Sequence, residues 1–368
     1  MKIIISGGGT GGHVYPAIAI ADGIKKIKPA AEILFVGAKG KIEMEKVPKA
    51  GYRIEGLWIS GFHRRLTIRN LLFPIKLLGS LWKVNRIINR FRPDVVVGVG
   101  GFASGPAVLL ANWKRIPTLI QEQNSFPGVT NRLLANKADR FCVAYKETER
   151  FFPIEKIALT GNPVRTEFFQ NLEAKRDEAF EYFGFEKNKK TLLVFGGSLG
   201  ARTINDAMVA NAKILSEHPE IQVLWQAGKL YIEEMQQSET AKLPTTQIRQ
   251  FIDRMDLAFA AADVIVARAG ASTISELCLV GKPAILIPSP NVAEDHQTKN
   301  AMALVKKKAA ILVKDSEAKE WIIEKALEVL GDEAIGNNLS ANIKKLAKPY
   351  ARAAIAKAVV RLATGCGQ

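Results

Sequence analysis

The sequence predicts an α/β protein with two doubly wound domains, each built on its own parallel sheet. Two aliphatic runs, 2–6 and 191–195, end in glycine-rich turns that begin at Gly7 and Gly196, 189 residues apart. A helix-forming stretch follows each turn, which is the order of a nucleotide-binding α/β unit. The chain has 368 residues and is long enough for two separate cores. Having the unit twice suggests two domains that face one another across a cleft.

Strands and helices alternate in the first half of the chain. A helix is expected to begin near Pro16, because proline is favoured in the first helical turn. Alternation of this kind builds a parallel sheet, since each crossover helix returns the chain to the same direction. The glycine and proline of Gly161-Asn162-Pro163 mark the expected joint between the domains. The strands expected before this joint are 3–5, 33–36, 94–99, 118–121 and 141–143.

The second half repeats this scheme and ends in a helical tail. The tail, 344–363, is expected to be broken at Pro349. The strands expected after the joint are 192–195, 222–226, 264–267 and 284–287.

Composition indicates a soluble globular enzyme. Apolar residues make up 48% of the chain and charged residues 24%, which excludes a disordered chain. Residues 2–5 are expected to form a strand at once, so no signal peptide is expected. Its longest uncharged run, 95–113, is interrupted by glycine and proline and is not expected to span a membrane. The three cysteines fall in no metal or redox spacing, which favours a reducing cytoplasm.

The net charge of +16 is concentrated in the first half. Residues 1–160 carry 25 Lys/Arg against 11 Asp/Glu, whereas 161–368 carry 27 against 25. Segment 56–93 holds eight basic residues and no acid, interleaved with leucine, isoleucine and tryptophan. Such a segment is typical of an interfacial membrane site; a core helix with a solvated basic face is the alternative. Few stackable aromatics argue against a nucleic-acid groove. The candidate membrane patch is Phe62, Arg64, Arg65, Arg69, Leu72, Phe73 and Lys76.

The first glycine turn does not carry the full signature of a dinucleotide site. Gly7, Gly9 and Gly12 satisfy G-x-G-x-x-G, but that fingerprint also needs an acid after the second strand to hold a ribose. The second strand ends in 34–39, where there is no carboxylate. NAD is therefore not expected to bind, and no cofactor is predicted.

The second half offers a better nucleotide site. Segment 270–276 follows a strand and opens a helix, so its small residues let a phosphate approach the positive helix end. Glu276 could accept hydrogen bonds from two ribose hydroxyls. The alternative is a capping box, in which Glu276 folds back toward Thr273.

Two histidines and a glutamine are further candidate site residues, and the sequence predicts no metal-binding carboxylate pair. His13 stands at a helix start, where it could act as a general base; capping or packing is the alternative. His296 and Gln297 follow a strand, where ligand groups of such sheets lie. No D-x-D pair occurs, so helix ends rather than a metal are expected to neutralise a diphosphate.

Together these segments resemble the MurG family of bacterial peptidoglycan glycosyltransferases, which make lipid II. The segments span nearly the whole chain in order: GGGTGGHVYP (7–16), GVGGFASGP (98–106), QEQN (121–124), TGNPVR (160–165), GGSLGAR (196–202), FIDRM (251–255), RAGASTISE (268–276) and EDHQTKNA (294–301). At position 296 this chain has histidine where some members have glutamine.

The resemblance implies a two-domain GT-B fold whose last helix crosses back to the N-terminal domain. It implies an acceptor- and membrane-binding domain of 1–162 plus about 341–368, and a UDP-GlcNAc-binding domain of 163–340. It also implies inverting transfer of GlcNAc from UDP-GlcNAc to the C4 hydroxyl of the muramyl sugar in lipid I. Anionic phospholipid would be a further partner, at the cytoplasmic face of the bacterial inner membrane.

The resemblance assigns roles to individual residues. His13 would be the base, Ile252 would read uracil through its backbone, and Glu276 would hold the ribose. The other donor contacts it implies are Thr10, Gly11, Gly12, Asn124, Arg165, Ser198, Ala271, Ser272, Thr273, Ile274, Ser275 and Gln297. Two alternatives stay open: an epimerase or hydrolase acting on UDP-GlcNAc, and a non-catalytic module that binds the sugar nucleotide.

Overall fold

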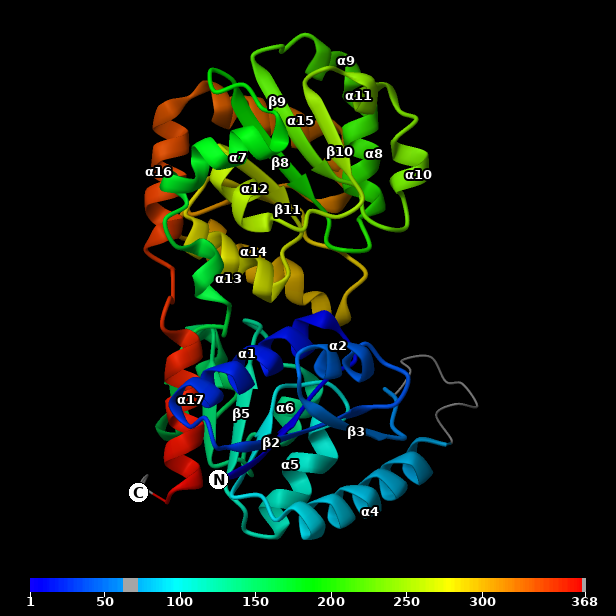
Figure 1. Ribbon diagram of the computed structural model, residues 1–368, viewed down its shortest axis with the longest axis vertical. Helices are drawn as coiled ribbons and strands as arrows, with labels where there is room; N and C mark the ends of the chain where they lie inside the picture. The colour runs from blue at the N-terminus through cyan, green and yellow to red at the C-terminus, as the bar shows by residue number, and fades with distance from the viewer. Residues whose placement is uncertain (62–71, 366–368) are drawn as a thin grey trace. The chain divides into compact units, whose positions relative to one another are not determined.

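The structure of the chain is a computed structural model that describes residues 1–61 and 72–365 (Figure 1). It divides into two compact units. Unit 1 combines Met1–Arg165 with Lys348–Gln368, and unit 2 is Thr166–Ala347. Four residues of the candidate membrane patch, Phe62, Arg64, Arg65 and Arg69, lie outside the described residues.

Unit 1 is built on a parallel sheet of seven strands in the order β3-β2-β1-β4-β5-β6-β7. Its strands are β1 (Lys2–Ser6), β2 (Glu32–Ala38), β3 (Arg53–Leu57), β4 (Val95–Gly98), β5 (Thr118–Glu122), β6 (Arg140–Val143) and β7 (Ile157–Leu159). Its helices are α1 (Gly11–Ile27), α2 (Glu43–Lys49), α4 (Phe73–Phe91), α5 (Ser104–Trp113), α6 (Val129–Leu133) and α17 (Ala351–Ala363).

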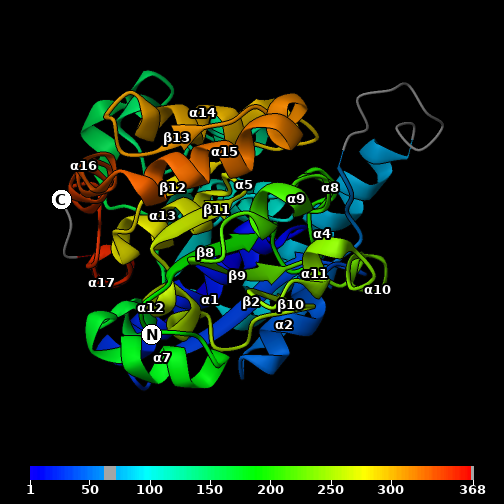
Figure 2. The same cartoon turned by 90° about the horizontal axis from the view of Figure 1, so that it is seen from above.

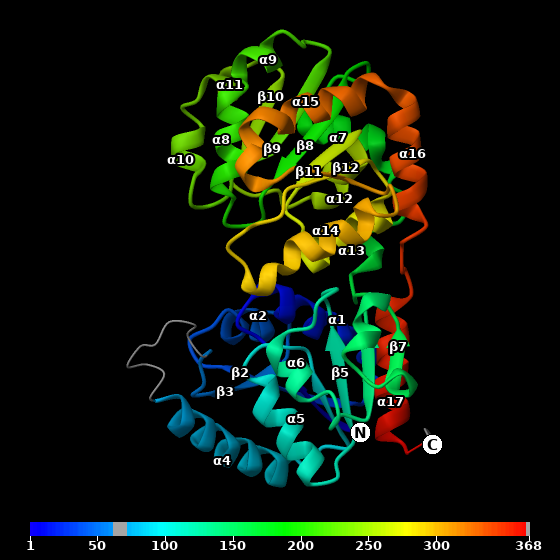
Figure 3. The ribbon, with the colours of Figure 1, turned by 180° about the vertical axis from the view of Figure 1, so that it is seen from behind.

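Helices cover both faces of this sheet. Side chains alternate along a strand, so Ile3 and Ile5 join one core while Ile4 joins the other. The first core includes residues of α1 and α17, which pack against each other (Figure 1). The second includes residues of α4 and α5, which are in contact on the opposite face (Figure 3).

Unit 2 repeats the design with six parallel strands in the order β10-β9-β8-β11-β12-β13 (Figure 2). Its strands are β8 (Lys190–Phe195), β9 (Ile221–Gln226), β10 (Thr246–Arg249), β11 (Val264–Ala267), β12 (Ala284–Leu286) and β13 (Ile311–Leu312). Its helices are α7 (Arg176–Phe183), α8 (Arg202–Ala210), α9 (Ala212–Ser216), α10 (Ile232–Met235), α11 (Glu239–Lys242), α12 (Met255–Ala261), α13 (Ala271–Val280), α14 (His296–Val305), α15 (Ala318–Gly331) and α16 (Glu333–Lys344).

The predicted α/β class with two parallel, doubly wound sheets is confirmed, and all nine expected strands are present. The expected helix start near Pro16 is wrong, because α1 begins at Gly11 and Pro16 lies inside it. The tail is interrupted between Lys344 and Ala351, around Pro349.

The chain returns to unit 1 at Lys348. The residues just before it, on α16, pack against the rest of unit 2. Ser340 Oγ donates to the Gly281 carbonyl, and the Lys344 side chain lies over Gly281. None of the helices in the described ranges combines the length and hydropathy needed to cross a bilayer.

Candidate active site

Each unit has one topological switch point, where the strand order reverses. Ligands of doubly wound sheets bind at this point, beyond the carboxyl ends of the strands. In unit 1 it lies between β1 and β4, and in unit 2 between β8 and β11. Both predicted glycine turns therefore begin at a switch point.

In unit 1 the turns after β1 and β4 contact each other through their backbones. The Gly8 N–H donates to the Gly100 carbonyl over 3.3 Å. A Cβ on Gly101 would lie 2.2 Å from the Gly8 carbonyl oxygen, and Gly101 has a φ of +82°. Only glycine meets both conditions without strain.

His13 lies half-buried in the first turn of α1, beside this contact. Its Nδ1 is 3.1 Å from the Gly8 carbonyl oxygen and 3.2 Å from Thr10 Oγ1. A carbonyl can only accept, so Nδ1 is assigned the proton and Nε2 the lone pair. A Cβ on Gly100 would lie 2.8 Å from Nε2, so a glycine at 100 leaves room for the ring. Thr10, Gly11 and Gly12 lie at the same start of α1.

Asn124 is held in place by the buried carboxylate of Glu122 at the end of β5. Glu122 Oε1 accepts from the Asn124 backbone N–H at 2.9 Å and from its side-chain amide at 3.2 Å. The other oxygen accepts from the Gly128 N–H and from Asn131 Nδ2. Burial raises the pKa of Glu122, and these hydrogen bonds act in the opposite direction.

Arg165, the last residue of the first segment of unit 1, lies apart from His13. Its guanidinium is 3.7 Å from the carboxylate of Asp22, which also accepts from the Tyr52 hydroxyl. Asp22 is nine residues after His13 on α1, or about 13 Å along the helix axis.

In unit 2 the side chain of Gln226 links the loops after β8 and β10. Its Nε2 donates to the Gly197 carbonyl at 3.0 Å, and its Oε1 accepts from the Ile252 N–H at 2.9 Å. Among the described residues, none donates to the Ile252 carbonyl oxygen. Ile252 therefore has a backbone acceptor with which to contact a ligand.

The loop after β11 leads directly into α13. Gly270 is the N-cap of α13, and no side chain caps the helix. Ala271 and Ile274 are buried, whereas Ser272, Thr273 and Ser275 are half-buried; Ser275 Oγ donates to the Ala271 carbonyl. The first turn of α13 thus combines small side chains with a helix N-terminus.

Glu276 lies within α13 rather than at its cap. The capping box of Thr273 and Glu276 is wrong, because the helix begins two residues before Thr273. Within the described part of the chain, no group donates a hydrogen bond to the Glu276 carboxylate. Burial without a partner raises the pKa of Glu276 to about 7.

Gln297 and His296 occupy the start of α14. Gln297 Oε1 accepts from the Ser289 N–H at 2.9 Å, which fixes its amide across the preceding loop. His296 is the first residue of the helix.

The two glycine turns differ in their backbone N–H groups. In unit 1 the N–H groups of Gly7, Gly8 and Gly9 donate to Val36 O, Gly100 O and Glu43 Oε2. In unit 2 no described residue accepts from the N–H groups of Gly197, Ser198 or Leu199. The N–H groups of 197–199 can therefore donate to an anion, whereas those of 7–9 are already used within the chain.

Three of these structural roles escaped the sequence analysis. Glu43 and Gln226 reach loops that are 34 and 26 residues away in the chain. Glu122 belongs to a recognised motif, but nothing in the sequence shows that it holds Asn124. The one sequence feature that could have indicated these roles is that each residue is polar and lies beside the end of a buried strand.

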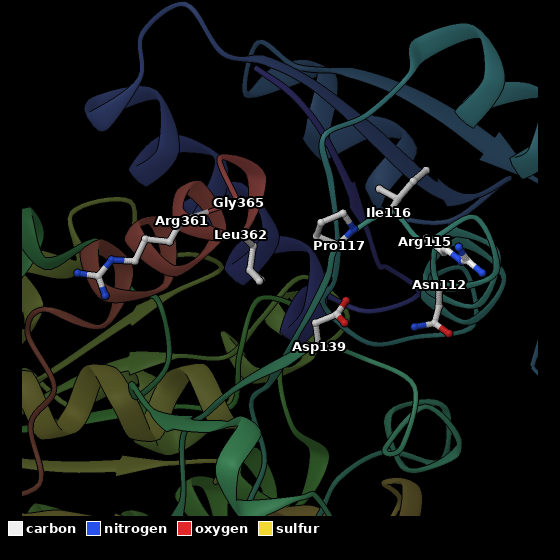
Figure 4. A pocket seen from close by; sticks show the side chains of 8 residues that line it. All are labelled: Asn112, Arg115, Ile116, Pro117, Asp139, Arg361, Leu362 and Gly365. Carbon is white, nitrogen blue, oxygen red and sulfur yellow. The ribbon is translucent and has the colours of Figure 1, made fainter. Parts of the chain in front are cut away.

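A separate groove of unit 1 lies at the opposite edge of the sheet (Figure 4). Its lining comes from the end of α5, from the segments before β5 and β6 and from the end of α17: Asn112, Arg115, Ile116, Pro117, Asp139, Arg361, Leu362 and Gly365. Pro117 and Asp139 precede β5 and β6, so this groove is not part of the candidate site. The described residues contain no group of three metal-binding side chains.

The described part of the candidate membrane patch lies on and before α4. Leu72 is exposed, Phe73 is half-buried, and Lys76 donates to Ser60 Oγ and lies over the Trp58 ring. Farther along α4, Ile75, Leu78 and Trp82 are 57%, 68% and 66% exposed. Their spacing of three and four residues places them on one helix face.

Comparisons with known proteins cover nearly the whole chain. The glycosyltransferase family 28 N-terminal domain matches residues 3–143, and the family 28 C-terminal domain matches residues 191–355. The UDP-N-acetylglucosamine–N-acetylmuramyl-(pentapeptide) pyrophosphoryl-undecaprenol N-acetylglucosamine transferase of Christiangramia forsetii is 53% identical over 98% of both chains. The transferase of the same name from Bacteroides fragilis is 51% identical over 99% of this chain and 96% of its own.

Solved structures give the same result. The structure of MurG from Acinetobacter baumannii superposes with a TM-score of 0.79 and 26% identity, over 98% of this chain and 99% of that chain. A UDP-GlcNAc 2-epimerase from Neisseria meningitidis reaches 0.68 at 14% identity, over 99% of this chain and 100% of its own, and shares the fold alone. The chain therefore belongs to glycosyltransferase family 28, among its N-acetylglucosamine transferases of the MurG type.

Proposed function

We propose that the chain transfers N-acetylglucosamine from UDP-GlcNAc to the C4 hydroxyl of the muramyl sugar of lipid I, giving lipid II and UDP. The observation that carries the assignment is the contrast between the two glycine turns. The N–H groups of Gly197, Ser198 and Leu199 have no acceptor among the described residues, whereas those of Gly7, Gly8 and Gly9 do, so the donor diphosphate binds in unit 2. The names of relatives that are more than 50% identical supply the sugars.

Unit 2 binds the uridine and diphosphate of the donor mainly through backbone groups and one carboxylate. The diphosphate lies against Ser198 and the first turn of α13, where the helix end neutralises its charge. The Ile252 carbonyl accepts from the uracil N3–H. Ionised Glu276 accepts from both ribose hydroxyls, which replaces the hydrogen bonds that its carboxylate lacks in the unliganded chain.

Unit 1 supplies the base. His13 Nε2 takes the proton of the C4 hydroxyl as its oxygen forms a bond to the anomeric carbon. The bond from that carbon to the UDP oxygen breaks on the opposite side, so the configuration inverts and UDP leaves with the electron pair. The Gly8 carbonyl stabilises the imidazolium that forms, because it accepts the Nδ1–H in both charge states. Thr10, Gly11, Gly12 and Asn124 contact the transferred sugar, and Gln297 and Arg165 contact the donor sugar or phosphates.

The acceptor is a lipid, and unit 1 carries a surface suited to an anionic bilayer. Ile75, Leu78 and Trp82 form an exposed apolar face on α4, and Lys76, Lys83 and Arg86 lie on the same helix. Apolar side chains can enter the headgroup layer while basic ones pair with phospholipid. We place the protein peripherally at the cytoplasmic face of the inner membrane, where lipid I presents its sugar.

The test uses the full chain with radiolabelled UDP-GlcNAc and lipid I. Transfer gives labelled lipid II, and UDP appears only when acceptor is present. Release of UDP at the full rate without acceptor would indicate a hydrolase instead, and conversion of UDP-GlcNAc into an epimeric UDP-sugar would indicate an epimerase. Binding of UDP-GlcNAc without turnover in either assay would indicate a binding module. EDTA is expected to leave the rate unchanged.

A further inference from the structure

Glu43 is a buried carboxylate that the proposed reaction does not use. It is the first residue of α2 and only 1% exposed. Its Oε1 accepts from the Ala38 N–H and its Oε2 from the Gly9 N–H, both at 2.9 Å. The side chain therefore connects the end of β2 to the glycine turn after β1.

The surrounding backbone is shaped to admit this carboxylate. A Cβ on Gly8 would lie 2.1 Å from Glu43 Oε1, and a Cβ on Gly37 would lie 2.5 Å from Glu43 Cγ. Both distances are too short for any side chain. Two glycines, on two different strand ends, thus leave the space that Glu43 fills.

The position of the carboxylate disfavours a nucleotide diphosphate at the start of this turn. In a dinucleotide-binding unit the turn after the first strand binds a diphosphate and an acid after the second strand binds a ribose. Here the acid that follows the second strand reaches the turn itself and takes the Gly9 N–H. The Gly7 and Gly8 N–H groups donate to backbone carbonyls, so the three N–H groups at the start of this turn are all occupied, one of them by a carboxylate of the chain itself.

The position of the first glycine turn also determines where the His13 imidazole lies. The Gly8 carbonyl that accepts from His13 Nδ1 is flanked by the Gly8 N–H, held by Gly100, and by the Gly9 N–H, held by Glu43. Loss of the Glu43 contact frees one side of the peptide unit on which the imidazole rests.

We propose that Glu43 is a positioning residue of the transfer reaction: it locks the first glycine turn, and through the Gly8 carbonyl it sets the place of His13. The effect of Glu43 on the transfer rate rests on the proposed function. Its effect on the structure of the first glycine turn does not depend on that function.

Glu43→Gln tests the proposal, because it keeps one acceptor oxygen and turns the other into an amide that repels an N–H. Glu45→Gln is the control: Glu45 lies on the same helix, but it is exposed and pairs with Lys46 and Lys49. Gly37→Ala is the second variant, because the added methyl group displaces the Glu43 side chain and leaves its carboxylate chemically unchanged. The backbone φ of Gly37 is one that alanine also adopts.

Two measurements distinguish an effect on the structure of the glycine turn from an effect on the reaction rate. Hydrogen–deuterium exchange of 7–13 should become about tenfold faster or more in Glu43→Gln and Gly37→Ala, while exchange of 196–200 stays as in the parent. The kcat should fall about 10- to 100-fold, as a misplaced catalytic group requires, with the dissociation constant of UDP within about twofold. Glu45→Gln should match the parent in every measurement.

Unchanged exchange of 7–13 in both folded variants would overturn the proposal. So would a loss of UDP affinity in proportion to kcat, or a melting temperature lowered with kcat unchanged, since either shows general destabilisation. If the parent protein makes no lipid II, the proposed function fails, and the exchange comparison still decides whether Glu43 locks the turn.

Discussion

The backbone N–H of Ile252 donates to Gln226 Oε1 over 2.9 Å, and both residues are only 4% exposed. The side-chain Nε2 of Gln226 in turn donates to the Gly197 carbonyl. One buried side chain therefore sets the separation between the loop proposed to bind uracil and the turn proposed to bind diphosphate.

Replacing Gln226 should weaken UDP binding. Gln226→Leu removes both hydrogen bonds and leaves a buried N–H unpaired, a loss of about 1–3 kcal/mol. We expect the dissociation constant of UDP, measured by calorimetry, to rise about tenfold.

The matched control is Gln222→Leu, at the other end of β9. Gln222 is also buried and bonds Thr191 and Glu186, away from the switch point. It should lower stability to a similar degree and leave UDP affinity within about twofold. Equal losses of affinity in the two variants would contradict the role given to Gln226.

UDP binding should depend on pH through Glu276. Its pKa of about 7 means that the carboxyl is largely neutral at pH 6 and ionised at pH 8. Only the ionised form accepts freely from both ribose hydroxyls, so UDP affinity should rise about tenfold from pH 6 to pH 8. Glu276→Gln should bind weakly at both values, and a pH response as steep as that of the parent would refute the assignment.

The same carboxyl should lower the stability of the unliganded protein at high pH. A pKa raised from 4.5 in the unfolded chain means that the folded state holds the proton more tightly, so stability falls as pH rises from about 4.5 to 7. Glu276→Gln removes this penalty. We expect its free energy of unfolding at pH 8 to exceed that of the parent by about 1–3 kcal/mol, toward the lower end because the side chain keeps some solvent access. Denaturant titration at pH 5 and pH 8 measures the difference.

Gly100→Ala should remove activity by displacing His13. The added methyl would lie 2.8 Å from His13 Nε2, at a φ of +93°. We expect kcat to fall about 100-fold. Gly40→Ala, at a φ of +70° with no neighbouring atom, reports the backbone strain alone. It should cost about 1 kcal/mol of stability and no activity. Similar kcat values for both variants would contradict the prediction.

The apolar face of α4 should hold the protein on anionic vesicles. Leu78→Glu replaces a residue that is 68% exposed, and flotation with phosphatidylglycerol vesicles should fall about tenfold or more. Leu230→Glu, in unit 2, changes a leucine of nearly equal exposure, 65%, and should float like the parent. Unchanged flotation of Leu78→Glu would argue against a membrane role for α4.

How far the sequence predicts this fold depends on where a strand lies in its sheet. The nine strands expected from aliphatic runs are all present, whereas β3, β7, β10 and β13 were not foreseen. These four are the edge strands of the two sheets. A central strand is buried on both faces and must be apolar throughout. An edge strand is short and partly solvated, as the sequence Thr246–Arg249 shows, and its residues do not distinguish it from a loop.

The candidate site follows the same division. Glycine residues at strand ends predicted the two turns that lie at the switch points, because backbone geometry there restricts the residue type. Glu43, Gln226 and Glu122 act by reaching another loop, so their roles exist only in the folded chain. The start of α1 was misplaced for a related reason: Gly11 and Gly12 open the helix although glycine is a poor helix former.

The packing of α17 against α1 has a consequence for biosynthesis. Ile355, Ala356 and Val359 share one core with Ile3, Ile5 and Val14. A ribosome makes the amino-terminal members of this core first and the carboxyl-terminal ones last. While the intervening polypeptide is translated, the face of α1 that packs against α17 stays exposed. The nascent chain therefore presents an apolar helix surface that chaperones can bind until α17 has been made.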